Sequence, residues 1–234
     1  MKPEGFVVLK ISGEAFSGKD TVFSPEGFSF IKYEIESLLE NSILPLIVLG
    51  GGNIYRGRSG LFSREAGDYM GMFATIINSM GLRDYLNENG IRANGYSSIE
   101  IARGIDFIDY DKVKKDMRLG VIPIFGGGTG NPYFSTDSLA SLRAAEFSIP
   151  LILKGSTVDG IYNRDPKKYS DAEFIPQITF ENAMKSDLGV VFDHAAFHLA
   201  RMNHTELVVY DFFKKGNTLK AFKKETGTHV KWEE

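Results

Sequence analysis

Two lysines stand beside glycine at the ends of short apolar runs. Lys10 is followed by Ile11-Ser12-Gly13, and Lys154 is followed by Gly155-Ser156. An ammonium group can balance the charge of a phosphate, and backbone N–H groups beside glycine can donate to its oxygens. Lysine combined with glycine and small hydroxyl residues therefore indicates a site for a polyphosphate.

Two further glycine-rich loops follow apolar runs, at Gly50-Gly51-Gly52-Asn53 and at 126–132. Glycine lets the backbone approach a ligand closely, and the N-terminus of a helix attracts anions. One such loop alone is more often a plain turn, but four strand ends of this kind favour a binding site. The chain lacks G-x-x-x-x-G-K-[ST] and lacks G-x-G-x-x-G with an acid about 20 residues on. We therefore expect phosphoryl transfer, on a scaffold that is neither a P-loop fold nor a dinucleotide-binding fold.

The elements that must position these loops alternate between strand and helix. A hairpin-like excursion is expected at 158–174 because of the turn signals Asp159-Gly160 and Asp165-Pro166, and a last short strand at 228–230. Strands buried on both faces and alternating with helices predict an α/β fold, a three-layer α/β/α sandwich around a mostly parallel sheet. Strands are expected at 6–11, 44–49, 91–95, 121–125, 151–154 and 206–210, and helices at 25–41, 68–89, 109–119, 138–146, 179–186, 193–203 and 216–223.

Composition limits the remaining possibilities. The 234 residues, 43% of them hydrophobic, can bury one sizeable core, so we expect a single domain over 1–234. Cysteine is absent, which excludes disulfides and suits a reducing cytosol. No apolar run has the length of a membrane helix or a signal peptide. The net charge of −3, with dispersed Lys and Arg, argues against nucleic-acid binding.

Six motifs in order together resemble one family. They are L-K-I-S-G-E at 9–14, G-G-G-N-I-Y-R-G at 50–57, G-D-Y-M-G-M at 67–72, G-T-G-N-P-Y-F-S-T-D at 128–137, L-K-G-S-T-V-D-G-I-Y at 153–162 and D-P-K-K at 165–168. The chain resembles the bacterial uridylate kinases (UMP kinases) of the amino-acid kinase fold, which are unrelated to P-loop nucleoside monophosphate kinases.

The resemblance implies transfer of the γ-phosphoryl group of ATP to UMP with Mg²⁺, and it implies a role for each matching residue. Residues 1–150 would form the UMP side and 151–234 the ATP side, and no residue is assigned as a metal ligand. The catalytic group would be Lys10, Lys154 and Asp137, with Asp137 orienting the two lysines. The ATP-binding residues would be Lys10, Ile11, Ser12, Gly13, Gly52, Arg56, Ser156, Tyr162 and Asp165, and the UMP-binding residues Gly51, Asp68, Thr129, Gly130, Asn131, Pro132, Tyr133, Phe134, Ser135 and Thr136.

The resemblance also implies a cytoplasmic homohexamer that GTP activates and UTP inhibits, with no nucleic-acid or membrane partner. Small departures from the commoner pattern are Ser135 and Ser156 in place of Thr, and Gly155 in place of Ala. Asn87 replaces a histidine that some relatives carry in the effector-linked region. Serine keeps the hydroxyl group, so these changes affect the tightness of fit more than the chemistry. Because of Asn87, effector control is the least supported part of the resemblance.

For individual residues, a purely structural role is an open alternative. Asp68 could cap the helix that begins there, Tyr162 could pack in the hairpin, and Arg56 could be a surface arginine. His194 and His198 lie four apart, but without a glutamate in the metalloprotease position they favour packing over metal binding. Two rival functions also remain: a related kinase for a carboxylate or carbamate, and a nucleotide sensor without catalysis.

Overall fold

The computed structural model describes residues 3–56, 61–185 and 192–232. Within these residues, nine strands form one sheet in the order β4-β3-β5-β2-β1-β6-β10-β11-β9, and every pairing in it is parallel except β10 with β11. The strands are β1 (Gly5–Ile11), β2 (Ile43–Leu49), β3 (Ala93–Ser97), β4 (Asp106–Phe107), β5 (Ile122–Gly126), β6 (Leu151–Ser156), β9 (Gln177–Thr179), β10 (Glu206–Asp211) and β11 (Thr228–Lys231).

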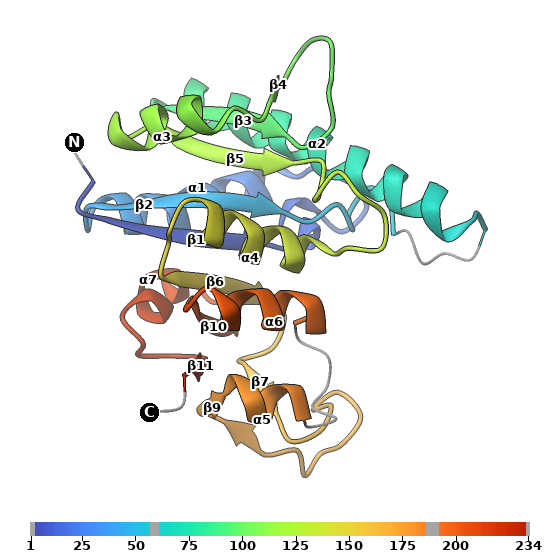
Figure 1. Cartoon of the computed structure of the whole chain (residues 1–234), viewed down its shortest axis with the longest axis vertical. Helices are drawn as coiled ribbons and strands as arrows, with labels where there is room; N and C mark the ends of the chain where they lie inside the picture. Colours follow the sequence, from blue (N-terminus) through green and yellow to red (C-terminus); the bar gives the residue numbers. More distant parts are fainter. Residues whose placement is uncertain (1–2, 57–60, 186–191, 233–234) are drawn as a thin grey trace.

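Helices cover both faces of this sheet (Figure 1). On one face α1 packs against α2, α7 and β2, and on the other α4 packs against α6, β1 and β6. The predicted three-layer α/β/α sandwich is therefore confirmed. The helices are α1 (Pro25–Leu39), α2 (Arg64–Glu88), α3 (Tyr110–Arg118), α4 (Thr136–Glu146), α5 (Phe180–Lys185), α6 (His194–Met202) and α7 (Asn217–Phe222), and a 3₁₀ helix spans Gly13–Phe16.

The helix α1 shows how the sequence produces these layers. The Ser24 side chain accepts a hydrogen bond from the Gly27 N–H at 2.9 Å, and Pro25 occupies the first turn, where its missing N–H costs nothing. Phe28, Ile31, Ile35 and Leu38 lie at helical spacing and are buried. Burying each such side chain contributes roughly 1.5–3 kcal/mol. This stripe fixes α1 on the sheet.

Several element boundaries differ from the sequence-based expectation. The helix α2 begins at Arg64 rather than Asp68, because the Ser63 side chain caps it by accepting from the Ala66 N–H. The strand expected at 91–95 runs instead over Ala93–Ser97, since the Ile91 N–H still closes the end of α2 on the Leu86 carbonyl. The short strands β4 and β9 and the 3₁₀ helix carry too few residues to show a periodicity. The last residue of the helix expected at 179–186 lies outside the described residues.

The expected excursion after β6 is confirmed as a small hairpin. Its strands β7 (Ile161–Tyr162) and β8 (Phe174–Ile175) pair antiparallel, with Tyr162 opposite Phe174. Their rings pack edge to face, with centroids 5.5 Å apart. The hairpin stands beside the carboxyl end of β6. No helix in the described ranges has the length and apolar character that spanning a bilayer requires.

Candidate active site

The carboxyl ends of β1 and β6 bring two lysines together. Lys10 and Lys154 are register partners on these adjacent parallel strands. Between them lies Asp137, in the first turn of α4, whose Oδ1 is 3.2 Å from Lys10 Nζ and also accepts a hydrogen bond from Lys154 Nζ. All three residues are buried, with exposed fractions of 7%, 8% and 9% for Lys10, Lys154 and Asp137. The structure thus places them in one cluster, which we call the Lys-Asp-Lys cluster.

The helix cap explains why Asp137 sits at this point. The Ser135 side chain accepts from the Asp137 N–H at 3.0 Å and from the Ser138 N–H at 3.3 Å, which starts α4. The Ser135 hydroxyl also donates to Asp193, the residue that caps α6. Ser135 and Asp193 therefore hold the first turn of α4 in place and so orient the Asp137 carboxylate.

Burial and charge act in opposite directions within the Lys-Asp-Lys cluster. Burial raises the pKa of Asp137, but the neighbouring Lys10 and Lys154 ammonium groups outweigh it and hold that pKa below its usual value. Burial lowers the pKa of Lys154 to about 7, and the Lys10 charge adds to this while Asp137 opposes it. One carboxylate faces two lysine side chains, so an anionic ligand would supply the second negative charge that balances them.

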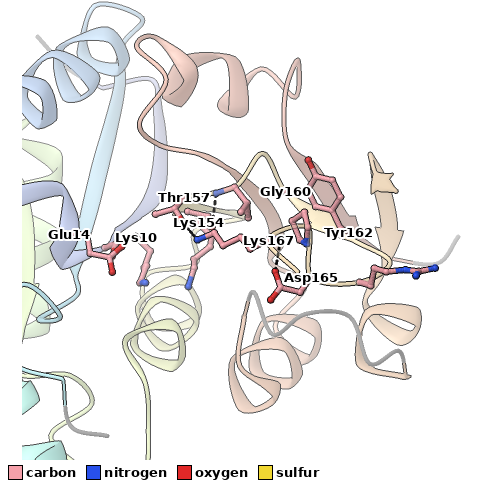
Figure 2. A pocket seen from close by; sticks show the side chains of 14 residues that line it. Lys10, Glu14, Lys154, Thr157, Gly160, Tyr162, Asp165 and Lys167 are labelled. Atoms are coloured by element: carbon pink, nitrogen blue, oxygen red, sulfur yellow. Dashed lines mark hydrogen bonds between the residues drawn. The ribbon is translucent and has the colours of Figure 1, made fainter. Parts of the chain in front are cut away.

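A cavity of about 370 Å³ opens over this cluster (Figure 2). Figure 2 shows the Lys10 and Lys154 side chains lying side by side, with Tyr162, Asp165 and Lys167 on the facing wall. The cavity brings together six residues predicted for the ATP side: Lys10, Ser12, Lys154, Ser156, Tyr162 and Asp165. Tyr162 both packs in the hairpin and lines this cavity, so the two interpretations of it are compatible.

A second, smaller cavity of about 160 Å³ lies on the other side of the start of α4. Its wall includes five residues predicted for the UMP side: Gly51, Asp68, Phe134, Ser135 and Thr136. Gly51 is needed for close packing, since a Cβ there would come within 2.8 Å of the Gly71 carbonyl oxygen of α2. Thr136 of this wall directly precedes Asp137, which contacts the Lys10 and Lys154 side chains of the larger cavity.

Asp68 connects α2 to the loop that closes the smaller cavity. Its Oδ2 accepts hydrogen bonds from the Tyr133 N–H and from Arg64 Nε, each at 2.8 Å. The Arg64 guanidinium also lies over the Tyr133 ring, 5.6 Å from its centroid. Tyr133 has a φ of 73°, a left-handed conformation that is unusual for a residue other than glycine. Asp68 therefore fixes the loop and does not cap the helix.

Other predicted residues lie apart from the cavity walls. The Ile11 side chain belongs to the core, and only its carbonyl, which accepts from the Gly50 N–H, reaches the loops. Arg56 pairs with Glu14 and its side chain is 69% exposed. Gly13 packs tightly on the next loop, where a Cβ would lie 2.7 Å from the Gly52 nitrogen.

The loop before Phe134 makes local contacts and lies outside the wall of the smaller cavity. Thr129 Oγ1 accepts from the Asn131 N–H at 3.3 Å, a local turn, and Gly130 approaches the Ser98 carbonyl closely. The Tyr133 side chain is exposed. Thr129, Gly130, Asn131, Pro132 and Tyr133 do not line the smaller cavity.

Sequence reasoning missed several residues that the fold brings to the larger cavity. Glu14, Thr157 and Lys167 line it. All three belong to motifs of the sequence, Glu14 to L-K-I-S-G-E, Thr157 to L-K-G-S-T-V-D-G-I-Y and Lys167 to D-P-K-K, but none of them was assigned a role. His194 and His198 are exposed on α6, and among the described residues no group of three His, Cys, Asp or Glu side chains could hold a metal ion.

Two buried lysines that share a carboxylate at the carboxyl edge of an α/β sheet define a phosphate-handling protein, and comparison with known proteins gives its family. The sequence profile of the Amino acid kinase family matches residues 5–211, so the chain belongs to that family. It is 39% identical over 224 residues to the uridylate kinase of Campylobacter concisus, covering 94% of each chain. It is 40% identical over 221 residues to that of Thermotoga maritima, covering 94% of this chain and 95% of the other.

Solved structures agree with the sequence relatives. The UMP kinase of Ureaplasma parvum superposes with a TM-score of 0.91 at 34% identity, covering 99% of this chain and 100% of that one. The UMP kinase of Bacillus anthracis gives a TM-score of 0.92 at 29% identity, over 100% and 98% of the two chains.

Proposed function

We propose that this chain is a UMP kinase, which transfers the γ-phosphoryl group of ATP to UMP and yields ADP and UDP. The observation that carries the proposal is the Lys-Asp-Lys cluster, whose lysines line the larger cavity and whose aspartate directly follows Thr136 of the smaller one. The similarity of the chain to uridylate kinases over nearly its whole length also supports the proposal. Two anionic substrates, one in each cavity, would meet at this cluster, where both lysines contact Asp137.

The reaction needs charge neutralisation rather than a base. The attacking group is a phosphate oxygen of UMP, already anionic near neutral pH, and the bond between the γ-phosphorus and the bridging oxygen of ADP breaks as the new bond forms. The enzyme must overcome the repulsion of two polyanions and hold them in line. Lys10 and Lys154 would stabilise the charge that moves through the transferring group.

The ATP side corresponds in the proposal to the larger cavity, within residues 151–234 together with the end of β1. Tyr162 would lie near the adenine, and Ser12 and Ser156 near the phosphates. A divalent ion, in our proposal Mg²⁺, would arrive with ATP and reduce the phosphate charge. Mg²⁺ usually keeps several waters and phosphate oxygens and takes few protein ligands. Glu14 and Asp165 are carboxylates of the cavity wall, and either could supply one such ligand.

The UMP side corresponds to the smaller cavity, within residues 1–150. Asp68 would accept hydrogen bonds from the ribose hydroxyls, and the loop 128–136 would enclose the nucleotide. The backbone N–H groups at the start of α4 would serve the UMP phosphate, and Arg56, which the resemblance assigns to ATP, would grip a phosphate where the two substrates meet. Arg56 would have to leave Glu14 to do so, which its exposure permits.

An acceptor panel tests the proposal. We expect ADP release from ATP with UMP, measured by a coupled assay, and a much slower release with acetylglutamate or carbamate. ADP release with those acceptors and not with UMP would identify the carboxylate or carbamate kinase. ATP binding without ADP release for any acceptor would identify a sensor.

The assembly, regulation and location remain proposals from family resemblance: a cytoplasmic homohexamer, activated by GTP and inhibited by UTP. One observation is compatible with assembly, because Tyr69, Phe73 and Ile77 form an exposed apolar row along one face of α2. Light scattering would give the oligomeric state, and assays with GTP or UTP would test the regulation.

A further inference from the structure

The larger cavity has a third lysine, which the proposed reaction has not used. Lys167 lies in the loop between β7 and β8 and lines the cavity opposite the strand ends (Figure 2). Its Nζ donates a hydrogen bond to the Thr157 hydroxyl at 3.2 Å, just beyond the end of β6. The side chain thus reaches from the hairpin loop toward the wall that carries Lys154.

The charge of Lys167 differs from that of the cations around it. Lys10 and Lys154 share Asp137, Arg164 lies 3.1 Å from an Asp171 oxygen, and the adjacent Lys168 lies 3.8 Å from Asp165 Oδ2. For Lys167, by contrast, the described residues include no carboxylate oxygen within 4.0 Å of Nζ, and its partner is a neutral hydroxyl. An anion in the cavity would be the first counter-charge that this ammonium group meets.

The backbone of the loop is fixed while the side chain can move. The Lys167 N–H donates to Asp165 Oδ1 at 3.0 Å, and the Lys168 N–H donates to the Asp165 carbonyl at 3.1 Å. These bonds form a local turn that anchors the base of the side chain. The exposed four-carbon stem can then carry the ammonium group from Thr157 into the cavity at little cost.

We propose that Lys167 is an ATP-binding residue, which exchanges its hydrogen bond to the Thr157 hydroxyl for a contact with the polyphosphate. The inference rests on the proposed function in one respect, that the larger cavity takes ATP. Because the contact is to the phosphate chain, Lys167 strengthens the binding of ATP more than that of AMP. It acts on the donor nucleotide, since it lines the larger cavity and not the smaller one.

Direct binding of ATP and of AMP, without UMP, tests the inference by calorimetry. Loss of one charge-assisted hydrogen bond predicts that Lys167→Met weakens ATP binding about tenfold and AMP binding less than about twofold. Lys167→Arg, which keeps the charge, should restore most of the ATP affinity. The matched control is Lys168→Met, which removes the neighbouring charge outside the cavity wall and should change ATP binding less than about twofold.

A second variant separates ligand binding from a structural role. Thr157→Val removes the resting partner of Lys167 but leaves the ammonium group, so ATP affinity should be kept or slightly improved. If the hydrogen bond merely ties the loop, Thr157→Val and Lys167→Met would weaken ATP binding equally, and the inference would be overturned. Unchanged ATP binding in Lys167→Met would overturn it as well.

The outcome is distinguishable from a failure of the proposed function. Suppose that the wild type binds ATP but forms no UDP, and that Lys167→Met binds ATP more weakly than the wild type. This result would refute the UMP kinase activity and would support the role of Lys167. A wild-type chain that binds no ATP would contradict both.

Discussion

The two cavities differ in the groups that they offer to a ligand. The larger cavity is lined by long charged side chains, including Lys10, Lys154 and Lys167, that come from two strand ends and a hairpin loop. The smaller cavity is lined by glycines, short hydroxyl residues and the first turn of a helix, with Asp68 as its charged group. One region offers lysine ammonium groups, two of which are held by Asp137, and the other offers backbone groups and a carboxylate.

This difference indicates which step each region controls. Lysines beside the transferring phosphate act on the barrier of the reaction, whereas a tightly packed wall and a carboxylate discriminate between acceptors. Variants on the two sides should therefore separate into effects on kcat and effects on KM for UMP.

The largest effect is expected for Lys154→Met. Losing one preorganised charge at the reacting centre should lower kcat by roughly 10²–10³. The control Lys32→Met removes a lysine on α1 that pairs with Glu36 at 2.9 Å, far from both cavities, and should leave kcat unchanged. Steady-state kinetics with circular dichroism of each variant would check this, and a kcat close to that of the wild type would refute the assignment.

An intermediate effect is expected for Asp68→Asn. The amide keeps the size but loses the charge that accepts from Tyr133 and Arg64, and in our proposal from the ribose. Loss of hydrogen bonds to a charged group should raise KM for UMP roughly tenfold or more, with KM for ATP nearly unchanged. Glu65→Gln, an exposed change in the same helical turn, is the matched control. Equal increases in both KM values would contradict the division between the cavities.

The smallest effect is a proton taken up when ATP binds. Before ATP binds, burial is the main cause that lowers the pKa of Lys154 to about 7, and the phosphate oxygens of bound ATP would raise this pKa. At a pH above that value the free amine is mostly neutral and the bound one charged, so binding takes up protons. Well below it both forms are charged, and the uptake vanishes.

Calorimetry in buffers of different ionisation enthalpy measures this uptake. We expect up to about one proton per ATP near pH 8, falling toward zero near pH 6. The uptake should disappear in Lys154→Met. Proton release, or an uptake that Lys154→Met retains, would show that Lys154 is not the group that titrates.

The strand and helix pattern could be predicted from the sequence because each element carries its own periodicity. The buried stripe of α1 and the apolar run of β1 are local signals, and the glycine loops follow them directly. That Lys10 and Lys154 lie at the same edge of the sheet also followed from a general rule, because parallel strands end at the same edge. That β1 and β6 are neighbours did not follow, because the sequence does not give the strand order.

Contacts between distant side chains could not be predicted in this way. Asp68 and Tyr133 lie 65 residues apart, and their hydrogen bond depends on how a loop returns to α2. The start of α2 was misplaced because Ser63 is an equally good cap, and nothing local ranks it above Asp68. The pairing of Arg56 with Glu14 and the approach of Lys167 to the cavity likewise arise from tertiary packing.

The central claim is that phosphoryl transfer takes place at the lysines that share Asp137. The most direct measurement is a single-turnover reaction with γ-labelled ATP and UMP, comparing the wild type with Lys10→Ala at saturating concentrations of both nucleotides. We predict that the wild type moves the label into UDP and that Lys10→Ala, folded and still binding both nucleotides, moves it at least about 10²-fold more slowly. Label transfer at the wild-type rate in Lys10→Ala would contradict the account.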